Sequence, residues 1–181
     1  KKKKYKIEKF KRNKKLNLSN FRFCSKYLNK KKFDIIINLS AITDIDFCEK
    51  NKFFSQKVNY QIVSNICKVI KNNKLNTYLV QFSTDQFYNN IRKNSERTNN
   101  YKNFYTKTKL LAENECKKIN SIVLRTNFAG RSMNKKRDSF SDWIFKSLKN
   151  KKIISLAHDI QFSPLSIESL CDILNIILIK R

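Results

Sequence analysis

A chain of 181 residues fits one domain with a buried core, and its apolar runs are shorter than the roughly 20 residues that cross a bilayer. The net charge of +26 is mostly lysine and accompanies abundant Asn, Ile, Phe and Tyr but one Gly and one Pro, so biased codon usage explains it better than a nucleic-acid or membrane partner. Five dispersed cysteines without a CxxC pair, and a lone His158 without ligand partners at metal-site spacing, indicate reduced thiols in a cytoplasmic protein and argue against a metal site.

Strands and helices are expected to alternate after a basic first segment. Residues 1–15 show little apolar periodicity, so we expect them to be poorly ordered. FDIIINLSA, at 33–41, is a β-branched run that predicts a strand buried on both faces. Apolar side chains then recur every four residues across 52–72, which predicts an amphipathic helix.

The rest of the chain continues the alternation. The expected elements are a strand at 77–82, a loop at 89–103, a helix at 104–118, a strand at 121–125, a helix at 140–148, a short strand at 153–156 and a closing helix at 166–179. This order predicts an α/β fold with a parallel sheet, forming one domain over residues 16–181. Ligands of such sheets bind beyond the carboxyl ends of the strands.

One group of polar side chains suggests chemistry at that edge. Ser83-Thr84-Asp85 follows the second expected strand, and Tyr105 and Lys109 lie four residues apart on the next helix, so they share one face. An ammonium about 4 Å from a phenolate oxygen stabilises that charge by up to about 4 kcal/mol. The spacing therefore predicts a lowered pKa for Tyr105. A phenol tuned in this way is a general acid for ketone reduction, and the Thr84 hydroxyl can bind the carbonyl or the phenol oxygen.

Several segments, in this order, resemble those of the dTDP-4-dehydrorhamnose reductases and related sugar-nucleotide reductases, which are extended short-chain dehydrogenases. The similarity runs from about residue 16 to residue 178. The segments that carry it are Asn38–Asp46 with Cys48-Glu49, Val58-Asn59, Phe82–Tyr88, Phe104–Glu113, Leu124–Phe128 and Asp159–Ser166.

The resemblance implies a Rossmann-like, doubly wound parallel sheet and reduction of a nucleotide-linked 4-keto sugar for polysaccharide precursors. It implies that Tyr105 donates the proton, that Lys109 lowers the pKa of Tyr105 and holds the nicotinamide ribose, and that Thr84 tunes the tyrosine. NADPH or NADH would supply the hydride. A nucleotide sugar is the expected substrate partner. Whether the chain forms a homodimer stays open.

The resemblance also assigns binding residues. Leu39, Ser40 and Ala41 would line the cofactor, with Asn17 and Leu18 as a weaker match to an adenine-side segment. Thr84, Asp85 and Phe128 would contact the sugar.

The chain departs from the family pattern at the pyrophosphate site. The family begins with a strand, a glycine-rich turn and a helix N-terminus that binds pyrophosphate. Here the one glycine, Gly130, lies far downstream, so we expect the first βαβ portion to be missing, through a fragment or a degenerate gene, and cofactor affinity to be weak. Thr106 stands where the family has glycine after the tyrosine.

Other functions stay open at this point. A non-catalytic binding subunit of the same fold, resembling the regulatory subunit of methionine adenosyltransferase, would not need Thr84, Tyr105 and Lys109 together. A nucleotide-sugar epimerase fits the Ser-Thr-Asp segment less well. A specific nucleic-acid binder rests on charge alone and is disfavoured.

Overall fold

The computed structural model of the chain describes residues 5–10, 17–88, 94–132, 138–156 and 163–180. It contains two compact units, Lys1–Leu124 and Arg125–Arg181. The predicted domain boundary near residue 15 lies outside the described residues. Within the described part of the predicted basic segment, residues 5–10 form no helix or strand, but Phe10 packs against Tyr27 with ring centroids 5.3 Å apart.

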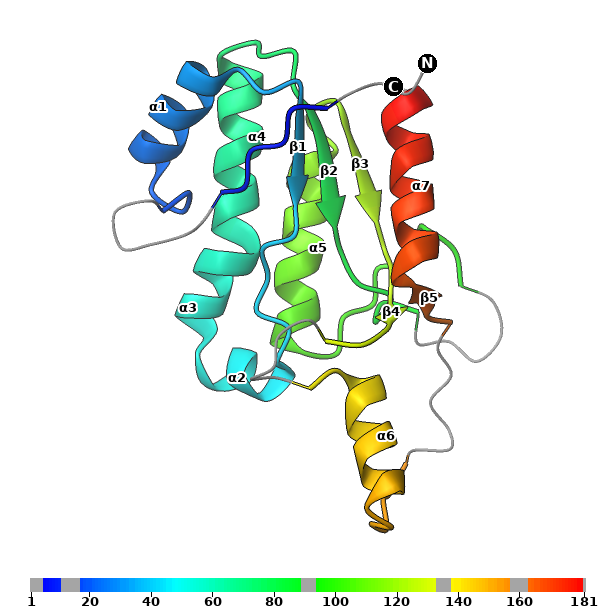
Figure 1. Cartoon of the computed structure of the whole chain (residues 1–181). Helices are drawn as coiled ribbons and strands as arrows, with labels where there is room; N and C mark the ends of the chain where they lie inside the picture. The colour runs from blue at the N-terminus through cyan, green and yellow to red at the C-terminus, as the bar shows by residue number, and fades with distance from the viewer. Residues whose placement is uncertain (1–4, 11–16, 89–93, 133–137, 157–162, 181) are drawn as a thin grey trace. The chain divides into compact units, whose positions relative to one another are not determined.

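The first unit is built on a parallel sheet of three strands in the order β1-β2-β3 (Figure 1). The strands are β1 (Ile35–Asn38), β2 (Tyr78–Phe82) and β3 (Ser121–Leu124). In register, Ile36 is opposite Leu79, and Leu79 is opposite Ser121. The three strands predicted from β-branched apolar runs are confirmed, and so is the Rossmann-like α/β fold class.

In the part of the first unit that the structure describes, five α-helices and one π-helical segment accompany this sheet. The predicted helix at 52–72 consists of α3 (Lys52–Gln56), the π-helix η1 (Lys57–Gln61) and α4 (Ile62–Asn72). The predicted helix at 104–118 is α5 (Phe104–Cys116). The helices that the sequence analysis did not predict are α1 (Phe21–Lys31) and α2 (Ile45–Lys50). Both begin at a side-chain cap, in which Asn20 accepts from the Phe23 N–H and Asp44 from the Phe47 N–H, each at 2.9 Å.

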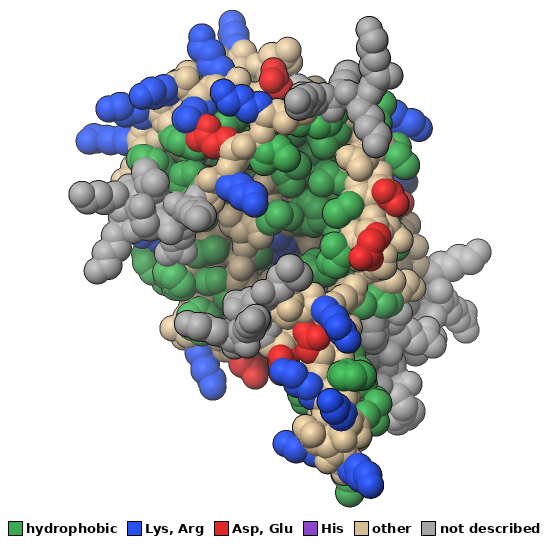
Figure 2. All heavy atoms as spheres, in the orientation of Figure 1, with side chains coloured by type: hydrophobic (Ala, Val, Ile, Leu, Met, Phe, Trp, Pro, Cys, Tyr) green, Lys and Arg blue, Asp and Glu red, His purple; other side chains and the backbone are tan. Residues whose placement is uncertain are grey.

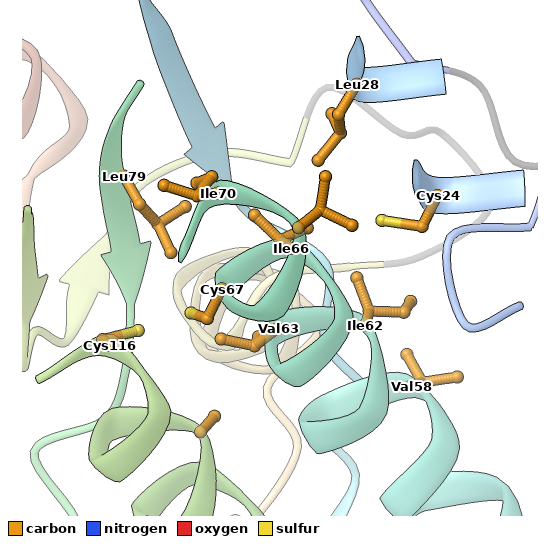
Figure 3. Close-up of a cluster of buried hydrophobic side chains, with 12 residues drawn as sticks. Cys24, Leu28, Val58, Ile62, Val63, Ile66, Cys67, Ile70, Leu79 and Cys116 are labelled. Carbon is orange, nitrogen blue, oxygen red and sulfur yellow. The ribbon is translucent and has the colours of Figure 1, made fainter. Parts of the chain in front are cut away.

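The core of the first unit lies where α4 packs against α1, α5 and β2. Val63, Ile66 and Leu79 are almost completely buried there, and Figure 3 shows their side chains with those of Cys67 and Cys116. All five cysteines are free thiols, and four of them are buried. This apolar layer fixes α5 against β2, and the first turn of α5 carries Tyr105.

Over residues 125–132, 138–156 and 163–180, the second unit contains a two-stranded parallel pair and two helices. The pair is β4 (Phe128–Ala129) with β5 (Leu165–Ser166), and the helices are α6 (Phe140–Lys149) and α7 (Ile167–Lys180). The helices were predicted, but the two-residue strands are too short to give a periodic signal. The predicted strand at 153–156 is wrong, since these residues have no strand structure and Ile153 is fully exposed.

The basic side chains visible in Figure 2 are dispersed over the surface. On the face shown in Figure 2, Lys and Arg side chains are spread over several elements rather than gathered in one patch. Among the described helices, none is both long and apolar enough to span a membrane.

The core predicts a large penalty at Leu79. Replacing this fully buried side chain by alanine removes contacts at the centre of the α4–β2 layer. We expect Leu79→Ala to lower the free energy of unfolding by about 2–5 kcal/mol in urea titrations followed by circular dichroism. Phe53→Ala is the control, because Phe53 is 81% exposed and its loss should change stability by no more than about 0.5 kcal/mol. Equal losses in both variants would contradict this assignment of the core.

Candidate active site

The predicted catalytic side chains, Thr84, Tyr105 and Lys109, lie at one edge of the sheet. Thr84 follows the carboxyl end of β2, and Tyr105 and Lys109 lie in the first turns of α5. The start of α5 is fixed by two polar side chains. Asn103 caps the helix, with its Oδ1 accepting from the Thr106 N–H at 2.8 Å, and Glu49 Oε1 accepts from the Phe104 N–H at 2.6 Å. Thr106, which replaces the family's glycine, completes the capping box and is fully buried. Tyr105 is therefore held in the first turn.

Thr84 and Tyr105 are brought together as predicted. Both are buried, with 4% and 5% of their surface exposed, and the Thr84 side chain lies close enough to the phenol to act on its pKa. Burial nevertheless raises the pKa of Tyr105, and the lowering effect of the Thr84 hydroxyl offsets this only in part. The predicted lowering of this pKa is therefore wrong for the chain without a ligand. At neutral pH, Tyr105 is an uncharged phenol that carries the proton a ketone reduction needs.

Lys109 lies one turn along α5, on the same helix face as Tyr105. Only 2% of it is exposed, and its Nζ donates to the backbone carbonyl of Phe82 at 2.7 Å. Burial lowers the pKa of Lys109 to about 8. The amine is thus still mainly protonated at neutral pH, with two N–H groups left to bind another oxygen.

Buried polar side chains to which the sequence analysis gave no role lie near Lys109. Gln81 Nε2 also donates to the Phe82 carbonyl, at 2.7 Å, and Asn38 Nδ2 donates to Gln81 Oε1 at 2.8 Å. Ser83 Oγ donates to the carboxylate of Glu113, which is 4% exposed. The sequence could have pointed to Glu113 through its position four residues after Lys109, because this spacing puts both charges on one helix face.

The predicted cofactor residues Leu39, Ser40 and Ala41 form the loop after β1. Leu39 is 69% exposed, and the Ser40 N–H donates to Asn38 Oδ1 at 3.1 Å. Leu39 and Ser40 are exposed and Ala41 is partly buried, and the cofactor role of all three stays a prediction.

Asn59 in the π-helix η1 binds the continuation of this loop at Ile42. Its Oδ1 accepts from the Ile42 N–H at 2.7 Å, and its Nδ2 donates to the Ile42 carbonyl at 3.0 Å and to Thr108 Oγ1 at 3.2 Å. The side chain is completely buried. Asn59 therefore ties the loop after β1 to the helix that carries Tyr105 and Lys109. The π-helix is consistent with such a role, because π-turns frequently lie at functional sites.

Asn17 and Leu18 have structural contacts of their own. Asn17 Oδ1 accepts from the Ser19 N–H at 3.0 Å, whereas the Leu18 carbonyl accepts from Asn65 Nδ2 at 2.9 Å. The Leu18 side chain packs against the core. Their adenine-side role stays a prediction.

The predicted sugar contacts fall in both units. Asp85 follows Thr84 in the first unit, and Phe128 lies in β4 of the second, where it is 55% exposed. Phe128 lines a cavity of about 300 Å³ formed with Asn127, Ala129, Gly130, Ser139, Phe140, Ser141 and Pro164. A Cβ on Gly130 would lie 3.1 Å from Ile167 Cγ1, so glycine permits the close approach of α7. His158 and residues 159–162 of the predicted Asp159–Ser166 segment lie outside the described residues.

The described residues include no cluster of three or more His, Cys, Asp or Glu side chains that could hold a metal ion.

Comparisons with known proteins agree with the motifs. The family model described as the RmlD substrate binding domain matches residues 1–181. A comparison with curated proteins found no match.

Three of the solved structures with a similar fold are described as dTDP-4-dehydrorhamnose reductases. A dTDP-4-dehydrorhamnose reductase from Clostridium acetobutylicum is 25% identical, with a TM-score of 0.79 over 92% of this chain and 59% of its own. A hypothetical dTDP-4-dehydrorhamnose reductase from Sulfolobus tokodaii is 28% identical, with a TM-score of 0.78 over 98% of this chain and 63% of its own. A third, from Bacillus anthracis in complex with NADP, is 22% identical, with a TM-score of 0.79 over 96% and 61%. The chain thus spans about three fifths of each structure. These matches confirm the family resemblance.

The contacts of Asn59 predict a specific local effect. Asn59→Ala leaves the Ile42 N–H and carbonyl without their partner, so we expect a loss of about 1–3 kcal/mol in stability and faster hydrogen exchange at the Ile42 amide. Asn114→Ala on the exposed surface of α5 is the control and should alter neither quantity by a comparable amount. Unchanged exchange at Ile42 in Asn59→Ala would contradict the role of Asn59 in holding the loop.

Burial of Lys109 predicts a pH dependence of stability. Its pKa falls from an ordinary value of 10.5 to about 8, so between these values the unfolded chain binds more protons at this site than the folded chain. The contribution of Lys109 to the free energy of unfolding should therefore rise with pH across this window and be constant below it. Comparing wild type with Lys109→Met by urea unfolding at about pH 7.5 and about pH 9.5 isolates this contribution. A difference that falls with pH would refute the burial effect.

Proposed function

The chain belongs to the family of the RmlD substrate binding domain, and on that premise we propose that it carries the proton-donating part of an NAD(P)H-dependent reductase of a nucleotide-linked 4-keto sugar. The observation that carries the proposal is the buried pair of Thr84 and Tyr105, whose side chains lie close together, with the protonated Lys109 one turn further on the same helix. All three side chains lie at the carboxyl edge of a parallel sheet, where ligands of this architecture bind.

In the proposed reaction Tyr105 completes the reduction of the ketone. The nicotinamide cofactor, when bound, supplies the hydride to the carbonyl carbon. The Tyr105 hydroxyl gives its proton to the carbonyl oxygen, which yields the alcohol. The raised pKa keeps the phenol protonated until the substrate oxygen gains charge. Thr84 lies next to the phenol and can orient it by a hydrogen bond between the two hydroxyls.

Lys109 fits the ribose half of such a cofactor. Its Nζ is anchored on the Phe82 carbonyl and keeps two N–H groups for hydroxyl oxygens. The residues present fit the pyrophosphate half less well, since the one glycine of the chain, Gly130, lies in the second unit beside α7. We therefore propose that this chain by itself binds the cofactor weakly.

Replacing Tyr105 tests the proposal. The chain should be expressed both as it stands and with any coding sequence that precedes Lys1 in its gene, and nicotinamide oxidation followed with dTDP-4-keto sugars. We expect Tyr105→Phe to lower turnover by about 10²- to 10⁴-fold, because the ketone oxygen loses its proton donor.

Tyr27→Phe is the matched control, because Tyr27 lies on α1 and its hydroxyl donates to Glu8 Oε1 rather than to a residue of the candidate site. It should keep the wild-type rate. Equal turnover in Tyr105→Phe and wild type would overturn the mechanism. Cofactor binding without turnover in any form would favour the non-catalytic binding subunit instead.

A further inference from the structure

We propose that Glu113 is a positioning residue: buried on the same face of α5 as Lys109 and bound to the same strand end, it keeps Lys109 charged and held against the end of β2. The inference deepens the proposed function and rests on it for its catalytic meaning, because a neutral or displaced Lys109 could not bind the cofactor ribose as an ammonium. Its structural content can be tested without substrate or cofactor.

The end of β2 holds both charges through two consecutive residues. The Phe82 carbonyl accepts from Lys109 Nζ at 2.7 Å, and the Ser83 hydroxyl donates to the Glu113 carboxylate. Lys109 and Glu113 are 2% and 4% exposed. The strand end therefore binds a cation and an anion that lie one turn apart on α5.

Burial makes the carboxylate necessary. A buried ammonium loses its hydration, and one strong backbone acceptor replaces only part of it. Glu113 is the leading group that favours the charged form of Lys109 against this desolvation. The neighbouring Gln81 amide is neutral and itself donates to the Phe82 carbonyl, so it adds no negative charge.

Ordinary helix stabilisation does not account for the pair. A glutamate four residues before a lysine is the favourable order on an exposed helix, and α5 has the reverse order at Lys109 and Glu113. A surface pair is also worth less than about 1 kcal/mol, whereas burying two charges is expensive. The arrangement therefore fits a functional requirement for a charged amine at this position.

The other titratable groups nearby act weakly on Lys109 or on its neighbours. Cys116, further along α5, also favours the charged amine, but less than Glu113 does. Asp85 after β2 and Cys48 in α2 act on Tyr105. Glu115 pairs with Lys118 at 2.8 Å.

Titration of the Lys109 side chain by NMR tests the inference. In protein labelled with ¹³C-lysine, the Lys109 signal is identified by its absence in Lys109→Arg, and it should titrate far below ordinary lysines because burial lowers the pKa to about 8. In Glu113→Gln we expect the midpoint of this signal to move down by about one pH unit or more, because the compensating charge is gone. Glu113→Asp keeps the charge and should give a midpoint between the two.

Glu115→Gln is the matched control, since it removes the same charge from α5 at a carboxylate that pairs with Lys118. It should leave the Lys109 midpoint in place. An unchanged midpoint in Glu113→Gln, or equal shifts in Glu113→Gln and Glu115→Gln, would overturn the inference.

A second variant covers the case in which Glu113→Gln does not fold. Removing one partner of a buried pair leaves an uncompensated charge, whereas removing both does not. Lys109→Met/Glu113→Gln should then recover the far-UV circular dichroism of the wild type, and failure to recover it would overturn the inference. If the NMR results hold but no nicotinamide-dependent turnover is found, the proposed function fails while the positioning role of Glu113 stands.

Discussion

The end of β2 is the point on which the candidate site depends. The Phe82 carbonyl binds the Lys109 ammonium and the Gln81 amide, and the next residue, Ser83, binds the Glu113 carboxylate. These contacts lie in a buried region where an unpaired polar group is costly, so they constrain the rotation and depth of α5 against the sheet. Because Tyr105 lies on the same helix, its position relative to Thr84 follows from this anchoring.

The apolar core and the polar site share one helix. The Cys116 end of α5 packs with α4 and Leu79, whereas its first turns carry Tyr105 and Lys109. Asn59 joins the two parts, since it emerges from the segment leading into α4 and binds both Thr108 of α5 and the loop after β1. The packing of α4 thus supports the loop that we expect to face the cofactor.

Electrostatics separates the two central side chains of the site. Both are buried, and burial favours the neutral form of each, which raises the pKa of Tyr105 and lowers that of Lys109. Glu113 counteracts the effect at Lys109, and the Thr84 hydroxyl counteracts it in part at Tyr105. The outcome at neutral pH is a protonated phenol one helical turn from a charged amine, which suits proton donation and hydroxyl binding, respectively.

The strands expected at 33–41, 77–82 and 121–125, the amphipathic helix at 52–72 and the helical spacing of Tyr105 and Lys109 could be predicted from the sequence, because periodicity and β-branched runs are local properties. The sequence analysis missed α1 and α2, whose starts depend on single capping side chains, and it wrongly predicted a strand at 153–156. The direction of the pKa shift at Tyr105 and the partners of Glu113 and Asn59 became visible only in the folded chain. Burial and contacts between residues 17 or more positions apart depend on packing, which no local pattern records.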